Sequence, residues 1–444
     1  MILMRGKVLI IACFATILLF AVNIASAGHI KRRKVKKLFK HSLIVKDHFT
    51  GFALYDMDEQ RMIYELNSDK YFTPASNTKL FTFYTCLKML GDSIPAFKYV
   101  IHGDSLLFWG TGDPSFLQTG LKATKGYNFL ENSGKKLFFS SGLYQNDLYG
   151  SGWAWNDYND YYQAEINEFP IEDNVAVLSA DKNGRLQISP KALSMYLKCD
   201  SSYKPSRFRV TRNFLDNTFV YPAMPVPANF HQEIPWKVST GLTASLLQDT
   251  LKKPVIETQM PLPTNAKVVY DANADTVYRH MLQPSDNFIA EQLLLVCSSV
   301  KFGILNADSV VNYSKRNFLN DLPDEPQWAD GSGLSRFNLF TPRSIVALLC
   351  KISDEMKNDS LLHSMMPIGG IAGTIRSAYK TDNGQPFVWA KTGSLMNVHN
   401  QSGYIVTRKG KRLAFSFMNN NFTRSSREIR DEMVRIMTYI HDNY

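Results

Sequence analysis

A serine and a lysine three positions apart, Ser76 and Lys79, are the first residues in this sequence whose types and spacing suggest chemistry. Residues 76–90 contain no Gly or Pro and carry apolar residues at helical spacing, which predicts a helix that begins at or near Ser76. Residues three apart on a helix share a face, so the Lys79 amine can reach the Ser76 hydroxyl. A lysine acts as a base only where its surroundings lower its pKa from about 10.4. The pair therefore predicts a serine nucleophile with an amine base.

The spacing alone is weak evidence, because a serine N-cap followed by a solvated lysine gives the same pattern. The same Ser-x-x-Lys spacing begins at five other serines: Ser133, Ser179, Ser201, Ser298 and Ser377. Two further motifs separate Ser76 from them. Ser285-Asp286-Asn287 is the only Ser-x-Asn in the chain, and Lys391-Thr392-Gly393 is the only Lys-Thr-Gly. In this order the three motifs form the signature of penicillin-interacting serine enzymes.

The third motif suits a substrate that ends in a carboxylate. Lys391 and Thr392 are predicted to lie at the end of a strand, where they supply a fixed cation and a hydroxyl beside backbone groups that can pair with an extended peptide. A glycine at position 393 permits close approach to the strand.

With these motifs the sequence resembles the low-molecular-mass penicillin-binding proteins of the D-alanyl-D-alanine carboxypeptidase/endopeptidase family that carry a large insertion after the nucleophile. Ser76 and Ser285 lie 209 positions apart, a gap typical of that branch. The resemblance covers about residues 45–440 and includes three further segments, which are 110–114 (GTGDP), 152–157 (GWAWND) and 330–336 (DGSGLSR).

The resemblance implies a role for each motif residue. Ser76 attacks the carbonyl of a D-Ala-D-Ala bond, and Lys79 removes its proton. Ser285 hydrogen-bonds toward that pair and passes the proton to the leaving amine, while Asn287 orients the substrate amide. The remaining roles belong to the strand: Lys391 and Thr392 bind the terminal carboxylate, Gly393 keeps the strand edge open, and the N–H groups of Ser76 and Ser394 form the oxyanion hole. Peptidoglycan stem peptides are the implied substrates, and β-lactam antibiotics the implied covalent inhibitors.

The patterning predicts an α/β (α+β) fold, with an antiparallel sheet built from both chain ends and flanked by helices, as in penicillin-binding and β-lactamase-like transpeptidase domains. Residues 51–66 read as a hairpin, residues 386–418 as three strands, and residues from 429 onward as a closing helix. Residues 97–237 are rich in Tyr, Trp, Asn and Ser with frequent turn signals, which predicts an inserted β-rich domain. The catalytic domain is accordingly assigned to residues 45–96 and 238–444.

The N-terminus predicts export. Two basic residues precede an apolar run over 8–22, and Ala25-Ser26-Ala27 follows, which is typical of a signal peptide over residues 1–27. A retained membrane anchor is the alternative. We expect the periplasm or cell envelope as the location.

The net charge of +10 is concentrated near the N-terminus. Residues 1–27 hold two positive charges and residues 31–40 hold seven with no acid, which leaves a net charge of +1 for residues 41–444. A basic leader, residues 28–44, on a near-neutral body predicts association with a membrane surface or a cell-wall polymer through residues 31–40, and no nucleic-acid partner. A solvated leader without a partner is the alternative.

No cofactor and no metal are expected, because neither CxxC pairs nor Cys/His ligand spacings occur. The sequence leaves open whether a disulfide forms among the four cysteines after residue 27, Cys86, Cys199, Cys297 and Cys350.

Two other functions are possible on the same fold. A β-lactamase requires an additional deacylation base, and no Glu-x-x-Leu-Asn pattern occurs between Asn287 and Lys391. A non-catalytic cell-wall binding protein would not need the intact motif residues. The balance of carboxypeptidase and endopeptidase activity stays open. The sequence also leaves open whether the aromatic residues of 153–162 fill a core or stack on the sugar rings of a glycan. It does not decide whether Asp330 and Ser332 line the cleft or shape a turn.

Overall fold

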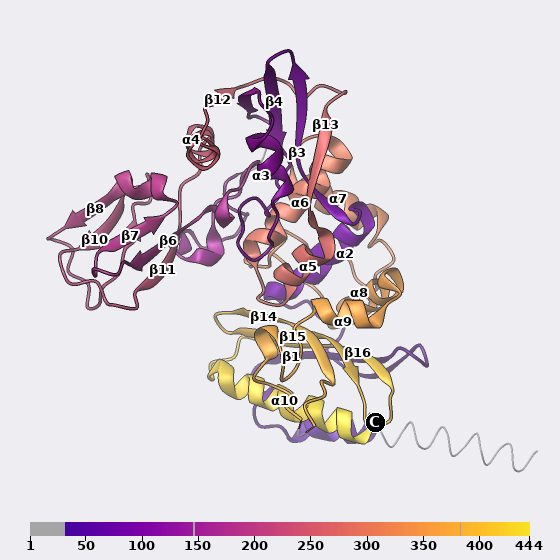
Figure 1. Ribbon diagram of the computed structural model, residues 1–444. Helices are drawn as coiled ribbons and strands as arrows, with labels where there is room; N and C mark the ends of the chain where they lie inside the picture. Colours follow the sequence, from indigo (N-terminus) through magenta and orange to yellow (C-terminus); the bar gives the residue numbers. More distant parts are fainter. Residues whose placement is uncertain (1–31, 145–146, 382) are drawn as a thin grey trace, which may run out of the picture.

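A computed structural model describes residues 32–144, 147–381 and 383–444 (Figure 1). The predicted signal peptide, residues 1–27, and the first residues of the leader lie outside these ranges. Figure 1 shows the sheet formed by the first and last strands of the described chain at one end of the molecule, a layer of helices in the middle, and a β-rich insert at the other end. Within the described residues, no helix combines the length and apolar character needed to span a bilayer.

The terminal sheet has five antiparallel strands in the order β14-β15-β16-β1-β2. Their bounds are β1 Phe49–Asp56, β2 Arg61–Leu66, β14 Val388–Leu395, β15 Val398–Val406 and β16 Arg412–Asn420. The first strand pairs with the last, so that Phe49 lies opposite Asn420 and Asp56 opposite Leu413. The predicted hairpin, the three predicted C-terminal strands and their union in one antiparallel sheet are confirmed.

The two faces of this sheet are covered by different helices, because side chains alternate along each strand. On one face Phe52 and Leu54 pack with the closing helix α10, Ser426–Asn443. On the other face Ala53 packs with the helical layer. The five apolar positions predicted for the closing helix are all buried: Ile429, Met433, Ile436, Met437 and Ile440.

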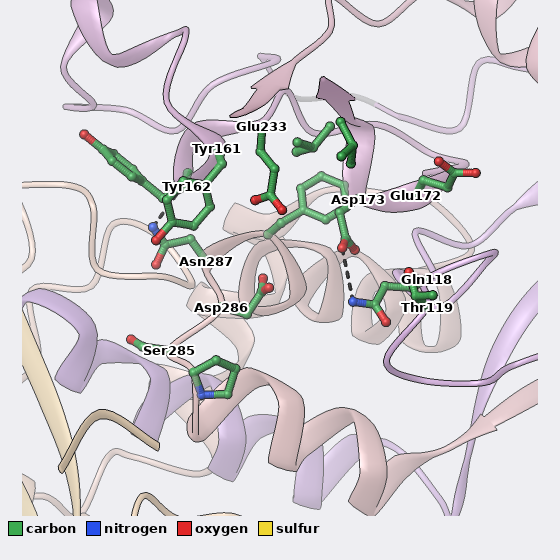
Figure 2. Close-up of a pocket in the computed structure, with 14 residues that line it drawn as sticks. Gln118, Thr119, Tyr161, Tyr162, Glu172, Asp173, Glu233, Ser285, Asp286 and Asn287 are labelled. Carbon is green, nitrogen blue, oxygen red and sulfur yellow. Dashed lines mark hydrogen bonds between the residues drawn. The ribbon is translucent and has the colours of Figure 1, made fainter. Parts of the chain in front are cut away.

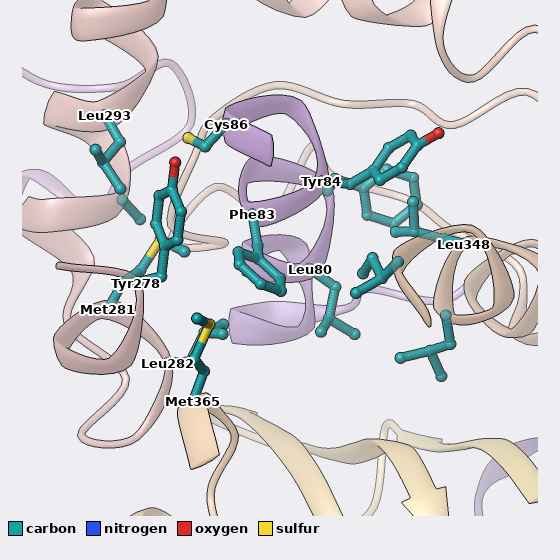
Figure 3. Close-up of a cluster of buried hydrophobic side chains, with 14 of the residues drawn as sticks. Leu80, Phe83, Tyr84, Cys86, Tyr278, Met281, Leu282, Leu293, Leu348 and Met365 are labelled. Carbon is teal, nitrogen blue, oxygen red and sulfur yellow. The ribbon is translucent and has the colours of Figure 1, made fainter. Parts of the chain in front are cut away.

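The helical layer surrounds α2, Lys79–Met89, the helix that follows Ser76. Every residue of α2 from Lys79 to Cys86 is buried, and Figure 3 shows Leu80 and Phe83 enclosed by neighbouring helices. Those neighbours are α5 Ala274–Leu282, α6 Asn287–Phe302, α7 Ala307–Asn317, α8 Pro342–Met356 and α9 Asp359–Met365. A helix buried on all sides has little freedom to shift, so α2 is a rigid support for the residues at its start.

The insert is built on a second five-stranded sheet in the order β12-β5-β4-β3-β13 and on two small three-stranded sheets, β11-β6-β7 and β8-β10-β9. The strands of the large sheet are β3 Ser93–His102, β4 Ser105–Gly110, β5 Lys136–Ser140, β12 Val255–Thr258 and β13 Lys267–Asn273. The small sheets contain β6 Val175–Ala180, β7 Leu186–Ser189, β8 Leu197–Asp200, β9 Thr211–Arg212, β10 Phe219–Pro222 and β11 His231–Pro235. Two helices, α3 Lys125–Glu131 and α4 Thr240–Leu251, accompany them. The insert is β-rich, as its turn signals predict.

The insert extends beyond the boundaries 97 and 237 that the sequence suggested. Strand β13 pairs with β3, so the large sheet begins at Ser93 and closes at Asn273. Helix α4, which the sequence assigned to the catalytic domain, packs Leu246 and Leu247 into the same apolar cluster as the insert strands. The periodicity of α4 identifies a helix correctly, but it carries no information on which of two cores the helix faces.

The basic segment before the sheet is folded, in contrast to the alternative of a solvated leader. Residues 32–41 form a helix, and Val35 and Phe39 are buried in the cluster that also contains α10. The Phe39 ring lies 4.8 Å from Phe52 and 5.3 Å from Phe417 between ring centroids. The helix is therefore part of the terminal sheet's packing.

All four cysteines that the structure describes are free thiols. The sulfur atoms of Cys86 on α2 and Cys297 on α6 are 3.8 Å apart and buried, whereas Cys199 is exposed.

Candidate active site

The nucleophile candidate lies in a tight turn that leads into α2. Residues Ala75–Thr78 form a 3-10 turn, and α2 begins at Lys79. The Lys79 Nζ atom is 3.0 Å from the Ser76 Oγ atom, which is the contact that the spacing predicted. Ser76 is half-buried while Lys79 is fully buried. The hydroxyl is thus accessible, and the amine that could activate it is shielded from water.

Side chains of the terminal sheet hold this turn in place. Asn400 on β15 donates its side-chain N–H groups to the carbonyls of Thr73 and Pro74, both at 2.9 Å. Asn420 on β16 accepts from the Thr73 N–H at 2.7 Å. The position of the Ser76 hydroxyl is therefore fixed from the sheet side as well as by α2.

The Lys79 amine has three acceptors, enough for every N–H of an ammonium group. Besides Ser76, it donates to Asn287 Oδ1 at 2.6 Å and to the Ser332 carbonyl at 2.6 Å. Burial lowers the pKa of Lys79 to about 8, against the opposing attraction of Asp330, Asp286 and Glu291. An amine with this pKa holds a useful neutral fraction at neutral pH, as a general base requires.

The second motif straddles the start of α6. Asp286 caps the helix by accepting the Ile289 N–H at 2.8 Å, and Ser285 just before it has a φ of 70°, in the left-handed region that a non-glycine residue seldom adopts. Asn287 accepts from Lys79 through Oδ1 and donates to the Tyr162 carbonyl at 3.0 Å. The strained turn directs Ser285 toward the third motif instead of along the helix.

The third motif brings a second buried amine beside Ser285. Lys391 in β14 donates to Ser285 Oγ at 2.7 Å and to the Thr392 carbonyl at 2.8 Å. The hydrogen bond of Ser285 therefore goes to Lys391 and not, as expected, to Ser76 or Lys79. Burial, and then repulsion by Lys79, lower the pKa of Lys391 well below its usual value. The Thr392 hydroxyl lies 2.7 Å from that of Thr374.

Gly393 lies where β14 passes close to the nucleophile turn. A Cβ at this position would lie 2.3 Å from the Pro74 carbonyl oxygen and 3.0 Å from the Ser76 nitrogen. The absent side chain therefore lets β14 approach the backbone of the nucleophile turn. Ser394 follows on the exposed side, and its hydroxyl pairs with His399 Nδ1 at 2.8 Å.

The segment around Asp330 closes the site from behind Lys79. The Asp330 carboxylate accepts the N–H groups of Gly333 at 2.8 Å and Ser335 at 2.7 Å, so it shapes a turn. Glu291 on α6 accepts the N–H groups of Gly331 at 2.9 Å and Ser332 at 2.7 Å. Together the two carboxylates present the Ser332 carbonyl to Lys79. Asp330 therefore shapes a turn, which is one of the two roles that the sequence left open for it.

A sequence model of the D-Ala-D-Ala carboxypeptidase 3 (S13) family matches residues 33–206 and 239–440. The chain belongs to this family. It is accordingly a serine-type D-Ala-D-Ala carboxypeptidase of the penicillin-binding kind, as the motifs indicated.

Individual relatives cover almost the whole chain of this S13 carboxypeptidase. The D-alanyl-D-alanine carboxypeptidase DacB of Haemophilus influenzae is 24% identical over 89% of this chain and 90% of its own length. Penicillin-sensitive carboxypeptidase A of Dictyostelium discoideum is 22% identical over 84% of this chain and 83% of its own. The crystal structure of penicillin-binding protein 4 (dacB) from H. influenzae superimposes with a TM-score of 0.69 at 22% identity, covering 91% of this chain and 98% of the other. The last comparison confirms the predicted fold.

A cleft of about 660 Å³ opens from Ser76. Ser394 and Met396 lie at one wall, and residues 152–157 of the insert contribute to another. The cleft is also lined by Tyr162, Gln163, Asn287, Gly333, Leu334 and Arg336. The insert of this S13 enzyme is therefore part of the wall of the site.

A second cavity of about 380 Å³ lies behind this wall, with Tyr162 and Asn287 shared between the two. Figure 2 shows the carboxylates of Asp173, Glu233 and Asp286 around it. Burial raises the pKa of Asp173 to about 8, and repulsion by Asp286 adds to the shift. Among the described residues, no set of three or more His, Cys, Asp or Glu is arranged to hold a metal ion.

The aromatic residues of 153–162 mostly serve contacts within the S13 fold. Trp153 donates its indole N–H to Asp330 at 2.9 Å, and Tyr158 packs edge-on against Phe214 of the insert. Trp155 and Tyr161 keep exposed rings. The cluster is thus an interface between the insert and the cleft with two rings left at the surface.

Sequence reasoning found every motif residue that the structure brings together and missed several groups that complete the site. Ser332 was named as a possible cleft residue, but the contacts made by the Ser332 and Tyr162 carbonyls carry no sequence signal, because every residue type has a carbonyl. Glu291 lies one helical turn after Asn287 and so shares its face, a spacing that could have drawn attention to it. Thr374 has no such signal.

Proposed function

We propose that this S13 carboxypeptidase cleaves the D-Ala-D-Ala bond of peptidoglycan stem peptides through an acyl-enzyme on Ser76. The observation that supports this proposal most directly is the 3.0 Å contact between the accessible Ser76 hydroxyl and the buried Lys79 amine. The amine and hydroxyl groups of the third motif lie on the adjacent strand, where a substrate carboxylate can be held.

In the acylation step, Ser76 Oγ attacks the carbonyl carbon while its proton passes to neutral Lys79. The developing oxyanion is held by the N–H groups of Ser76 and Ser394, each worth about 2.7–4 kcal/mol in comparable sites. The close approach of β14 at Gly393 supports this assignment, because it places the backbone of the two segments together. Collapse of the intermediate breaks the peptide bond, and the leaving amine takes a proton.

Proton delivery to the leaving amine is assigned to Ser285. Its hydroxyl accepts from Lys391, so its own proton is free to be donated to the leaving amine. The proton that Lys79 took from Ser76 replaces it, which returns Lys79 to the neutral form. D-Ala then departs, and a water molecule attacks the ester with Lys79 again as the base. The products are the shortened peptide acid and free Ser76.

The experiment that tests this function is intact mass measurement after exposure to a penicillin. We expect one penicilloyl adduct that persists for minutes or longer, because the lactamase pattern Glu-x-x-Leu-Asn, which supplies a deacylation base, does not occur between Asn287 and Lys391. A peptide ending in D-Ala-D-Ala should turn over under the same conditions. Many turnovers per second on a chromogenic cephalosporin would favour a β-lactamase, and no adduct with no turnover would favour a non-catalytic binding protein.

Replacing Lys391 should separate carboxylate recognition from chemistry. The carboxylate of an arriving substrate restores the favourable charge partner that the buried Lys391 lacks, so binding raises its pKa and protonates it. Lys391→Ala should weaken kcat/KM for a carboxylate-bearing peptide about 10- to 150-fold, the value of a charge-assisted hydrogen bond.

An ester analogue of the same peptide is the control for this measurement. It lacks the carboxylate and should lose far less from Lys391→Ala. Equal losses for the acid and the ester would show that Lys391 acts on the reacting centre or on the fold.

We also infer that the enzyme acts in the cell envelope after export, in line with the signal-like residues 1–27. Residues 31–40 are the candidate contact with a membrane surface or a wall polymer. The open cleft around Ser76 suits both a free stem-peptide end and a cross-link, so turnover of both peptide types is the measurement that sets their balance.

A further inference from the structure

The basic helix at the N-terminal end of the described chain presents an uninterrupted cationic face. Six side chains of residues 32–41 are both cationic and exposed: Arg32, Arg33, Lys34, Lys36, Lys37 and Lys40. The sequence has no acidic residue before Asp47. Within the described part of the chain, none of the six forms an ion pair with a carboxylate. The positive charge of this face is therefore not neutralised by the protein itself.

The opposite face of the same helix is anchored. Val35 is fully buried, and the Phe39 ring packs among Phe52, Tyr64 and Phe417 at centroid distances of 4.8 to 5.6 Å. The cations thus project from a docked helix, so binding a partner does not incur the entropy loss of ordering a free tail.

A groove of about 580 Å³ runs between this helix and α10. Its cations are Lys34, Lys37 and Arg435, and the one acid that lines it, Glu432, accepts Arg435 at 2.7 Å. Apolar side chains line it as well, among them Leu43, which is 74% exposed. The groove combines a cationic rim with an apolar side chain directed to the outside.

We propose that this face binds the headgroups of anionic phospholipids, with Leu43 entering the membrane interface. The proposal deepens the envelope location proposed above and rests on it. Anionic headgroups complement the unneutralised cations, each of which adds affinity near a charged membrane surface. A membrane is favoured over a wall polymer because an exposed leucine gains from an apolar phase, which a hydrated polyanion does not provide.

The geometry also sets the orientation of the bound enzyme. The basic helix lies on the α10 face of the terminal sheet, whereas α2 lies on the other face. In Figure 1 the insert is at the end of the molecule remote from α10. A protein bound through this face would turn its cleft and insert away from the bilayer.

The test is co-sedimentation of the full chain with vesicles of phosphatidylcholine alone or of phosphatidylcholine mixed with anionic phosphatidylglycerol. We expect binding to the anionic vesicles only, weakening as salt is raised. Replacing Arg33, Lys36, Lys37 and Lys40 together by Gln should weaken it at least about 100-fold. Leu43→Ser should weaken it by a smaller factor at every salt concentration.

A matched control removes the same charge elsewhere. Lys182, Arg185, Lys191 and Lys204 are exposed cations of the insert, and their joint change to Gln should leave vesicle binding near wild type. Penicillin labelling of Ser76 should be equal in all variants, so a failure of the catalytic proposal would show separately.

Three outcomes would overturn the proposal. Equal binding to neutral vesicles would assign attachment to the apolar run 8–22. Equal losses of vesicle binding in the two quadruple variants would show that binding depends on the net charge of the protein and not on this face. Binding to purified wall polymer without binding to vesicles would assign the face to that polymer.

Discussion

Ser76→Ala should abolish covalent labelling by penicillin, with no adduct detectable by intact mass even after long exposure. No other atom of the cleft is proposed to attack the β-lactam carbonyl, so removing the hydroxyl removes the only acceptor of the acyl group. The fold should be unchanged, because Ser76 is half-buried and its hydroxyl is bonded only to Lys79 among the described residues. Circular dichroism and the melting temperature check that condition.

The chain supplies its own controls for this experiment. Ser179 and Ser377 begin the same Ser-x-x-Lys spacing, but Ser179 lies in β6 of the insert, where its hydroxyl accepts from Gln187. Changing either to Ala should leave labelling near wild type. An adduct on the Ser76→Ala protein, or loss of labelling in a control, would assign the nucleophile elsewhere.

Lys79→Ala should slow acylation about 10²- to 10⁴-fold while leaving the Ser76 hydroxyl present. With a pKa of about 8, about one-tenth of the Lys79 amine is neutral at pH 7, about 200-fold more than for an amine with a pKa of 10.4. A depressed lysine pKa means that the reactive form gains as pH rises. The acylation rate should therefore increase about tenfold per pH unit below pH 8 and level off above it.

Lys79→Ala should lose this pH dependence of acylation as well as most of the acylation rate. Lys98 is the matched control, since burial also lowers its pKa and its amine is bonded to the Ser299 carbonyl, away from the cleft. Lys98→Ala should retain both the rate and the profile. If Lys79→Ala keeps the rise toward pH 8, a different group is the base.

The parts of the site that could be predicted from sequence are local or chemically distinctive. The contact between Ser76 and Lys79 follows from helical spacing alone, and Lys391-Thr392-Gly393 stands out by its residue types. The hydrogen bond from Lys79 to the Ser332 carbonyl joins residues 253 positions apart through a backbone group, and no sequence pattern predicts it.

Two errors have the same physical origin. Ser285 was expected to face Ser76 and Lys79, but its left-handed φ turns the hydroxyl to Lys391, and backbone dihedrals are not encoded in a three-residue motif. Helix α4 was assigned to the wrong core, because amphipathicity fixes the apolar side of a helix but not its partner. Both outcomes are set by tertiary packing, which overrides what neighbours in sequence can determine.

The pairing of β1 with β16 has a consequence for how the enzyme is made. Asn400 and Asn420, which hold the Ser76 turn, arrive more than 300 residues after it, and the strand carrying Lys391 arrives with them. Closing so long a loop is slow, and a chain that is still being synthesised lacks these strands. The nucleophile stays unassembled while the chain is being synthesised, so acylating capacity appears only in a molecule whose last strands have been made and paired.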